Sequence, residues 1–306
     1  MGNSADLPTP YQFSEALQNL KMRIERLESD LPWPESRVNG GVVEIELGGL
    51  TEVAIIGDIH GDYATLHKIL DRIEALLESS GLAVFLGDYI DRGPPEGQAK
   101  VLWELARLAT DYRGRVVTLR GNHEPPRGLE PVPHDYPYVL KHLYGARGEE
   151  LYSLSRELFD VMPHAMILRG SALLLHGGPP TINLELLKKD PHSYLGYDRS
   201  IEVLVEILWN DPMESDSPRA YNPRGVGSLW GRPVTMAVTK SLGVGLIVRG
   251  HEPASLGYKL NHAGKVVTLF SRLGPPYHNV MAAYIECSIE ELAEGRVEDC
   301  IRTIAG

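Results

Sequence analysis

The sequence predicts an α/β fold, because short apolar runs suited to strands alternate along the chain with amphipathic stretches suited to helices. Its 306 residues, 43% of them hydrophobic, are enough to bury one large core. The runs that match buried strands cover residues 53–56, 82–86, 116–119, 172–175 and 246–248. We therefore expect most of the chain to form one α/β domain.

The start of the chain predicts a helix and then a strand. Leucines and isoleucines recur there at steps of three and four, which forms one apolar stripe: Leu17, Leu20, Ile24, Leu27 and Leu31. Ser14 is the expected N-cap, and Pro32 ends the helix because proline cannot continue it. A strand follows at 42–47. We expect residues 1–50 to be an extension of a catalytic domain that covers 51–306.

The rest of the chain supplies connecting helices and one long loop. Residues 64–79 and 97–109 are amphipathic and follow the first two predicted strands. Residues 210–227 are rich in Pro, Ser, Asp and Asn, a composition typical of surface loops. These helices are expected to cover the sheet, and the loop to lie on the surface.

Composition excludes several classes of partner. The formal net charge of -11 argues against nucleic acid or an anionic membrane, both of which need clustered Lys and Arg. No apolar run approaches the roughly 20 residues that span a bilayer. The only cysteines, Cys287 and Cys300, lack a Cys-x-x-Cys spacing, which argues against a disulfide framework or a zinc ribbon. We expect a soluble, cytoplasmic protein.

Polar clusters follow directly after all five predicted strands. They occupy residues 57–61, 87–93, 121–124, 176–178 and 249–251. Ligands bind at the carboxyl ends of strands in α/β sheets, so these clusters are expected to converge in space. Their carboxylates, imidazoles and amide suit divalent manganese, iron or zinc, and they outnumber the ligands that one ion needs. Two neighbouring ions can hold a phosphate and activate a water, so the pattern predicts a phosphoesterase.

Three of these clusters resemble the signatures of the phosphoprotein phosphatase family, which includes the type-1 and type-2A protein phosphatases and calcineurin. They are GDIHG at 57–61, GDYIDRG at 87–93 and GNHE at 121–124. The resemblance extends from about residue 50 to about residue 285. It implies a metallophosphoesterase fold, in which a two-sheet β-sandwich is flanked by helices in four αββα layers. It also implies a serine/threonine protein phosphatase that acts on phosphorylated proteins. The sequence does not identify a regulatory subunit.

The same resemblance implies the ligands of two divalent ions. Asp58 and His60 would hold the first ion, Asn122, His176 and His251 the second, and Asp88 would bridge both.

The remaining roles implied by the resemblance concern the phosphate and the leaving group. His123 would be the general acid, oriented and kept protonated by Asp91. The phosphate would be bound by Arg92, Arg224, Asn122 and Tyr277. The loop before Tyr277 is two residues longer than in the family, and Arg272 stands where the family has alanine.

Other interpretations remain open at this point. A dinucleoside polyphosphate hydrolase shares the metal motifs, although that family tends to have Asp where Glu124 stands. A non-catalytic module could keep the fold, and single Asp residues after strands can be helix caps. The remaining histidines, His134 among them, lack strand-end placement and are assigned no chemistry.

Overall fold

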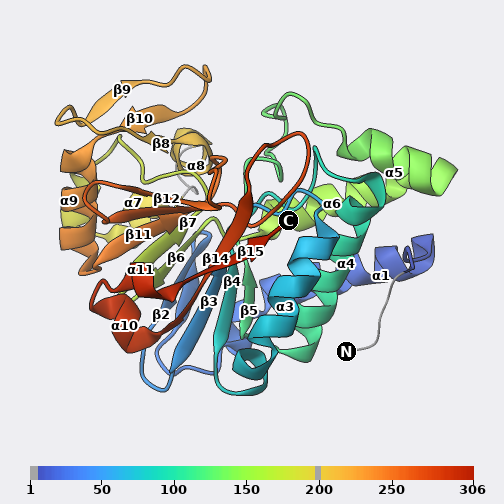
Figure 1. Ribbon diagram of the computed structural model, residues 1–306, viewed down its shortest axis with the longest axis horizontal. Coiled ribbons are helices and arrows are strands. Elements are labelled where there is room, and N and C mark those ends of the chain that lie inside the picture. Colours follow the sequence, from blue (N-terminus) through green and yellow to red (C-terminus); the bar gives the residue numbers. More distant parts are fainter. Residues whose placement is uncertain (1–5, 197–200) are drawn as a thin grey trace.

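The computed structural model describes residues 6–196 and 201–306, which form two sheets packed face to face with helices outside them (Figure 1). The first sheet has five strands in the order β15-β14-β3-β4-β5. Their bounds are Ile301–Ala305, Met281–Ser288, Glu52–Ile56, Leu82–Phe85 and Val116–Thr118. Strands β3, β4 and β5 are parallel, so their carboxyl ends share one edge.

The second sheet has seven strands in the order β1-β2-β6-β7-β11-β13-β12. Their bounds are Arg37–Asn39, Val42–Ile45, Ala165–Leu168, Ala172–Leu175, Leu246–Arg249, Val266–Leu269 and Tyr258–Asn261. Strand β11 runs parallel to both β7 and β13. All five strands predicted from apolar runs are therefore present, two of them in this sheet. Strands β1 and β2 bring part of the expected extension into it.

Alternation along the strands divides the core into layers. Val84 and Leu174 face the space between the two sheets. Phe85, beside Val84, packs against the helices of the first sheet, whereas Leu173 packs against those of the second. Since successive strand residues point to opposite faces, this division is the expected result of burying both faces of each sheet. The predicted four-layer αββα arrangement is confirmed.

Two groups of helices form the outer layers (Figure 1). The first sheet is covered by α1, α3, α4, α5 and α6, with bounds Pro10–Glu25, Tyr63–Glu78, Pro95–Asp111, Tyr136–Tyr144 and Gly148–Val161. The second is covered by α7, α8 and α9, with bounds Pro191–Leu195, Ile201–Trp209 and Arg232–Leu242. Both connecting helices expected from the sequence appear, as α3 and α4.

The N-terminal helix begins earlier than predicted and is broken near its end. Thr9, not Ser14, is its N-cap: the Thr9 side chain accepts from the backbone of Gln12, and the Gln12 side chain accepts from the backbone of Thr9. The helix stops at Glu25, and the short helix α2 (Leu27–Asp30) continues after Arg26.

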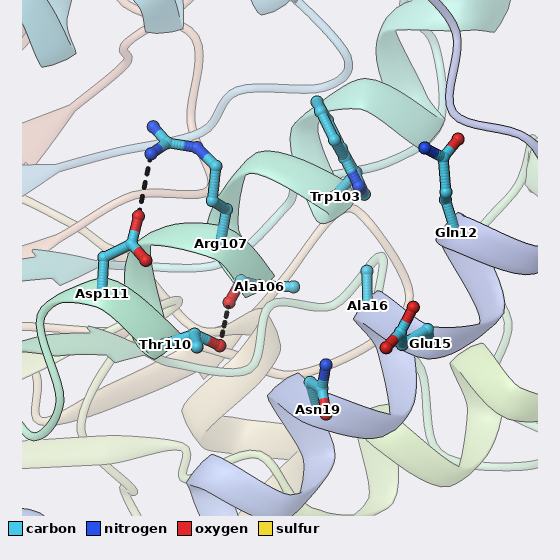
Figure 2. Close-up of a pocket in the computed structure, with 9 residues that line it drawn as sticks. All are labelled: Gln12, Glu15, Ala16, Asn19, Trp103, Ala106, Arg107, Thr110 and Asp111. Carbon is cyan, nitrogen blue, oxygen red and sulfur yellow. Dashed lines mark hydrogen bonds and ion pairs between the residues drawn. The ribbon is translucent and has the colours of Figure 1, made fainter. Parts of the chain in front are cut away.

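Helix α1 packs against α4 and leaves a pocket of about 220 Å³ between them. Figure 2 shows Gln12, Glu15 and Asn19 of α1 on one side of it and Trp103 and Arg107 of α4 on the other. None of the polar strand-end residues lines it. Within residues 6–196 and 201–306, every helix is too short or too polar to traverse a lipid bilayer.

Two features of the C-terminal half correct the sequence interpretation. Residues 210–227 are not one loop, because β8 (Asp211–Pro212) and β9 (Arg219–Tyr221) pair with β10 (Ser228–Trp230) in a small third sheet. Cys287 and Cys300 form a disulfide, although their spacing gave no local sign of one. It ties β14 to the short helix α11 (Val297–Cys300), which follows α10 (Ile289–Ala293).

Candidate active site at the strand ends

The polar clusters after β3, β4, β5, β7 and β11 meet at one end of the two packed sheets. We call six of their residues the ligand basin: Asp58, His60, Asp88, Asn122, His176 and His251. All six are buried. An isolated bridge between Asp58 and Phe270 joins the two sheets at this point. The convergence expected from the strand ends is therefore observed.

Asp88 lies at the centre of the ligand basin, and its two oxygens face different donors. Oδ2 is 3.4 Å from His60 Nε2, whereas Oδ1 is 3.2 Å from His176 Nε2. The side-chain oxygen of Asn122 lies 2.9 Å from the same His176 nitrogen and 2.8 Å from His251 Nδ1. Asp88 therefore belongs to two groups of potential ligands at once.

The protonation of His60 shows that the basin fits cations. Its Nδ1 lies 2.8 Å from the carbonyl oxygen of Ile90, which can only accept, so this nitrogen carries the ring proton. Burial lowers the pKa of His60 to about 3, so the ring is neutral and Nε2 keeps a lone pair. That lone pair faces the carboxylates of Asp88 and Asp58, at 3.4 and 3.8 Å. Because neighbouring acceptors repel each other, this donor set fits a divalent ion.

The carboxylates lead to the same inference. Burial and the neighbouring Asp88 raise the pKa of Asp58 to about 7. Asp58 Oδ2 is buried and accepts no hydrogen bond from the described residues. Burial also opposes the charge on Asp88, but the His176 and His123 imidazoles hold its pKa well below the usual range. Two buried carboxylates this close stay charged together only if cations neutralise them.

The backbone around the basin is strained and tightly packed. His60, Asp88 and His251 all have positive φ, at 43°, 57° and 70°, which is uncommon for residues with a side chain and often marks functional sites. A Cβ on Gly121 would lie 2.3 Å from Asp88 Oδ1, and one on Gly250 would lie 2.4 Å from Asp58 Oδ1. Only glycine lets these loops approach the carboxylates so closely.

His123 lies beside the basin with one ring nitrogen bound and the other open. Its Nδ1 is 2.6 Å from Asp91 Oδ2. Its Nε2 is buried and has no hydrogen-bond partner among the described residues. Its backbone N–H donates to Asp88 Oδ1 at 2.9 Å, which fixes it against the basin. A pair so placed can orient a proton donor, which is the role that the family resemblance implies for His123 and Asp91.

The predicted phosphate-binding residues outside the basin, Arg92, Arg224 and Tyr277, are named the phosphate rim. Arg92 Nη1 donates to the Tyr277 hydroxyl at 2.8 Å, and the Tyr277 ring stacks on His60 at a centroid distance of 5.6 Å. Arg224 Nε donates to Asp211 Oδ2 at 2.8 Å, and 37% of its side chain is exposed. The structure therefore brings Tyr277 to the basin despite its longer loop.

Four supporting residues were assigned no role from the sequence. Glu124 accepts backbone N–H bonds from Asp88 and Tyr89, and Asp211 holds Arg224. Arg272 donates to the carbonyls of its own loop, and its guanidinium carbon lies 5.0 Å from the centre of the Tyr277 ring. His134 shares Asp91 with His123. Glu124 stands within the 121–124 motif and was detectable, whereas the bonds of Arg272 and His134 have no local signal.

Comparisons with known proteins find one matching family and several named relatives. The model of the calcineurin-like phosphoesterase family matches residues 51–255. A Caenorhabditis elegans protein named as a serine/threonine-protein phosphatase is 32% identical over 72% of this chain and 58% of its own length. Human serine/threonine-protein phosphatase 5 is 28% identical over 82% of this chain and 49% of its own. The chain thus spans about half the length of these relatives.

Solved structures show the same fold. A Saccharomyces cerevisiae serine/threonine phosphatase similar to human PP5 superposes with a TM-score of 0.73 at 20% identity, covering 98% of this chain and 90% of that one. A cold-active protein tyrosine phosphatase gives a TM-score of 0.58 at 19% identity, covering 85% of this chain and 80% of that one.

Proposed function

The chain belongs to the calcineurin-like phosphoesterase family, and on that premise we propose that it is a metal-dependent protein serine/threonine phosphatase. It would hydrolyse phosphomonoesters by direct attack of water, without a phosphoenzyme. The observation that carries the proposal is the position of Asp88, whose two oxygens face two separate groups of ligand atoms. A carboxylate so placed suits a pair of ions.

The ligand basin would hold both ions. Asp58 and His60 would ligate one, and Asn122, His176 and His251 the other, with Asp88 shared between them. These nitrogen and oxygen donors suit manganese, iron or zinc. When bound, such a pair clamps phosphate oxygens and lowers the pKa of the attacking water.

The neighbouring side chains would handle the proton and the phosphate. His123 Nε2 would give a proton to the leaving alkoxide, while Asp91 holds the ring through Nδ1. Arg92 and Arg224 would bind the phosphate oxygens through their planar guanidinium groups, helped by Asn122 and Tyr277. Two ions and two arginines outweigh the charges of Asp58, Asp88 and Asp91, so an acidic protein can still attract a phosphate dianion.

The names of the relatives support phosphoserine and phosphothreonine in proteins as substrates. We place the catalytic unit at residues 51–306, with 1–50 as an extension that completes one sheet, and we place the enzyme in the cytoplasm. The substrate class is tested by comparing a phosphoserine peptide with a dinucleoside tetraphosphate under one set of conditions. A higher kcat/KM for the peptide is expected, and preference for the dinucleotide would contradict the proposal.

The role of His123 is tested with His123→Asn. We expect turnover of an alkyl phosphate to fall by about 10²-fold or more, because the alkoxide then leaves without a proton. Turnover of an activated aryl phosphate should change far less, since its leaving group needs no proton, and metal content should stay the same. Equal losses on both substrates would exclude His123 as the acid.

A further inference from the structure

His134 lies in the connection between the 121–124 motif and α5, outside every signature segment. Its Nδ1 is 2.7 Å from Asp91 Oδ2, the same oxygen that lies 2.6 Å from His123 Nδ1. The other Asp91 oxygen accepts the backbone N–H of Tyr136 at 2.8 Å. Asp91 is fully buried, so these bonds determine how its carboxylate is oriented.

The proton positions around His134 follow from its two partners. A charged carboxylate only accepts, so Nδ1 of His134 carries the proton that binds Asp91. In the neutral ring, His134 Nε2, 2.9 Å from the Tyr152 hydroxyl, is then the acceptor and Tyr152 the donor. Arg156 Nη1 in turn donates to the Tyr152 oxygen at 3.4 Å and to Glu130 at 2.8 Å. Each hydrogen bond in this series, from Arg156 to Tyr152, from Tyr152 to His134 and from His134 to Asp91, therefore donates towards Asp91.

This series of hydrogen bonds is largely shielded from solvent at His134. The side chain of His134 is only 9% exposed, and Tyr152 and Arg156 both belong to helix α6. Bonds that donate in one direction polarise each other and strengthen the last one, here the bond to Asp91. Burial alone would raise the pKa of Asp91, but the hydrogen bonds from His123 and His134 lower it well below its ordinary value. The second imidazole therefore helps to keep Asp91 charged and in place.

We propose that His134 is a positioning residue, whose hydrogen bond to the Asp91 carboxylate, supported by helix α6, lets Asp91 hold the His123 ring towards the leaving group. The proposal rests on the function proposed above, because it assigns His134 a part in proton delivery by His123. The proposal predicts that replacing His134 lowers kcat most on substrates whose leaving group needs a proton.

Two substitutions separate the two bonds of His134. His134→Asn keeps an N–H donor near the position of Nδ1, so the bond to Asp91 can form while the contact with Tyr152 is lost. His134→Gln places its amide near the position of Nε2, so the Tyr152 contact is kept and the Asp91 bond is lost. We expect His134→Gln to lower kcat on a phosphoserine peptide by about tenfold, which is a part of the roughly 10²- to 10⁴-fold that general acid catalysis supplies. His134→Asn should stay within about threefold of the wild type.

On an activated aryl phosphate, both variants should keep wild-type kcat within about twofold, since proton delivery is not needed there. Metal content and melting temperature check that the basin and the fold are intact. His142→Gln, the same substitution at an exposed histidine of α5, is the control and should change neither substrate. Tyr152→Phe removes the donor to His134 without touching the loop, and should lower peptide turnover by about threefold.

The outcomes separate the two proposals. If the wild type fails to hydrolyse phosphomonoesters, or if His123→Asn affects both substrates equally, the proposed function or its acid is wrong. If His123→Asn behaves as expected but His134→Gln loses activity equally on both substrates, or not at all, His134 has no positioning role. A His134→Asn variant as impaired on the peptide as His134→Gln would also overturn the inference.

Discussion

The ligand basin and the phosphate rim meet at one site but are held in place differently. The basin residues follow directly after strands and are buried, and several are fixed by backbone bonds, such as Asp58 to the N–H of His251. The rim residues lie on loops and are held by other side chains, as Arg224 is by Asp211 and Arg92 by Tyr277. Strand geometry therefore fixes the basin, whereas pairwise side-chain bonds fix the rim. Changes in the basin should abolish metal binding, and changes in the rim should only reduce phosphate binding.

The largest effect is expected for Asp88→Asn. An amide offers one oxygen and no charge, so it cannot serve both groups of ligands that face Asp88. We expect the loss of at least one ion per chain and a fall in kcat of roughly a thousandfold or more, because metal ions supply several kcal/mol of transition-state stabilisation. Metal analysis of purified protein and turnover of an aryl phosphate measure both quantities.

Asp71→Asn, at an exposed aspartate of α3, is the control. Two ions retained per chain by Asp88→Asn would show that the basin is not centred on this residue.

A smaller effect is expected for Arg224→Lys in the rim. Lysine keeps the positive charge but loses the planar fork that matches a phosphate, and it has no Nε to bind Asp211 in the same geometry. We expect kcat/KM to fall by about 10- to 100-fold with metal content unchanged. Steady-state kinetics with metal analysis on the same preparation test it. Loss of metal from Arg224→Lys would contradict the claim that the rim binds phosphate without holding the metal ions.

The basin could be predicted from sequence because its signal is local. Five apolar runs predicted five strands, and the polar cluster after each run supplied a candidate ligand such as His60, His176 or His251. Within each sheet the carboxyl ends of parallel strands share one edge, so the meeting of the clusters within a sheet followed from the pattern alone. The two-sheet arrangement did not, because periodicity does not say which strands pair; it came from the family resemblance.

What the sequence missed depends on partners distant along the chain. Strands β8 and β9 are too short and too polar to show a strand pattern, and they exist because β10 pairs with both. His134 meets Asp91 from 43 positions away, with no strand end to mark it. The helix start is a different case, since Thr9 and Gln12 have the capping-box spacing in the sequence itself, whereas Ser14 is followed three residues later by Leu17.

The smallest effect concerns Arg272, which adapts the rim to its longer loop. Its guanidinium donates to the carbonyls of Leu273 and Pro275 and lies over the Tyr277 ring, whose hydroxyl accepts from Arg92. If Arg272 acts by placing Tyr277, then Arg272→Met and Tyr277→Phe should each lower kcat/KM by about three- to tenfold, in line with the net contribution of one ordinary hydrogen bond. The double variant should be no worse than the poorer single variant, because both changes remove the same contact. Losses that multiply would mean that Arg272 contributes independently of Tyr277, and the rim would then have a third arginine of its own.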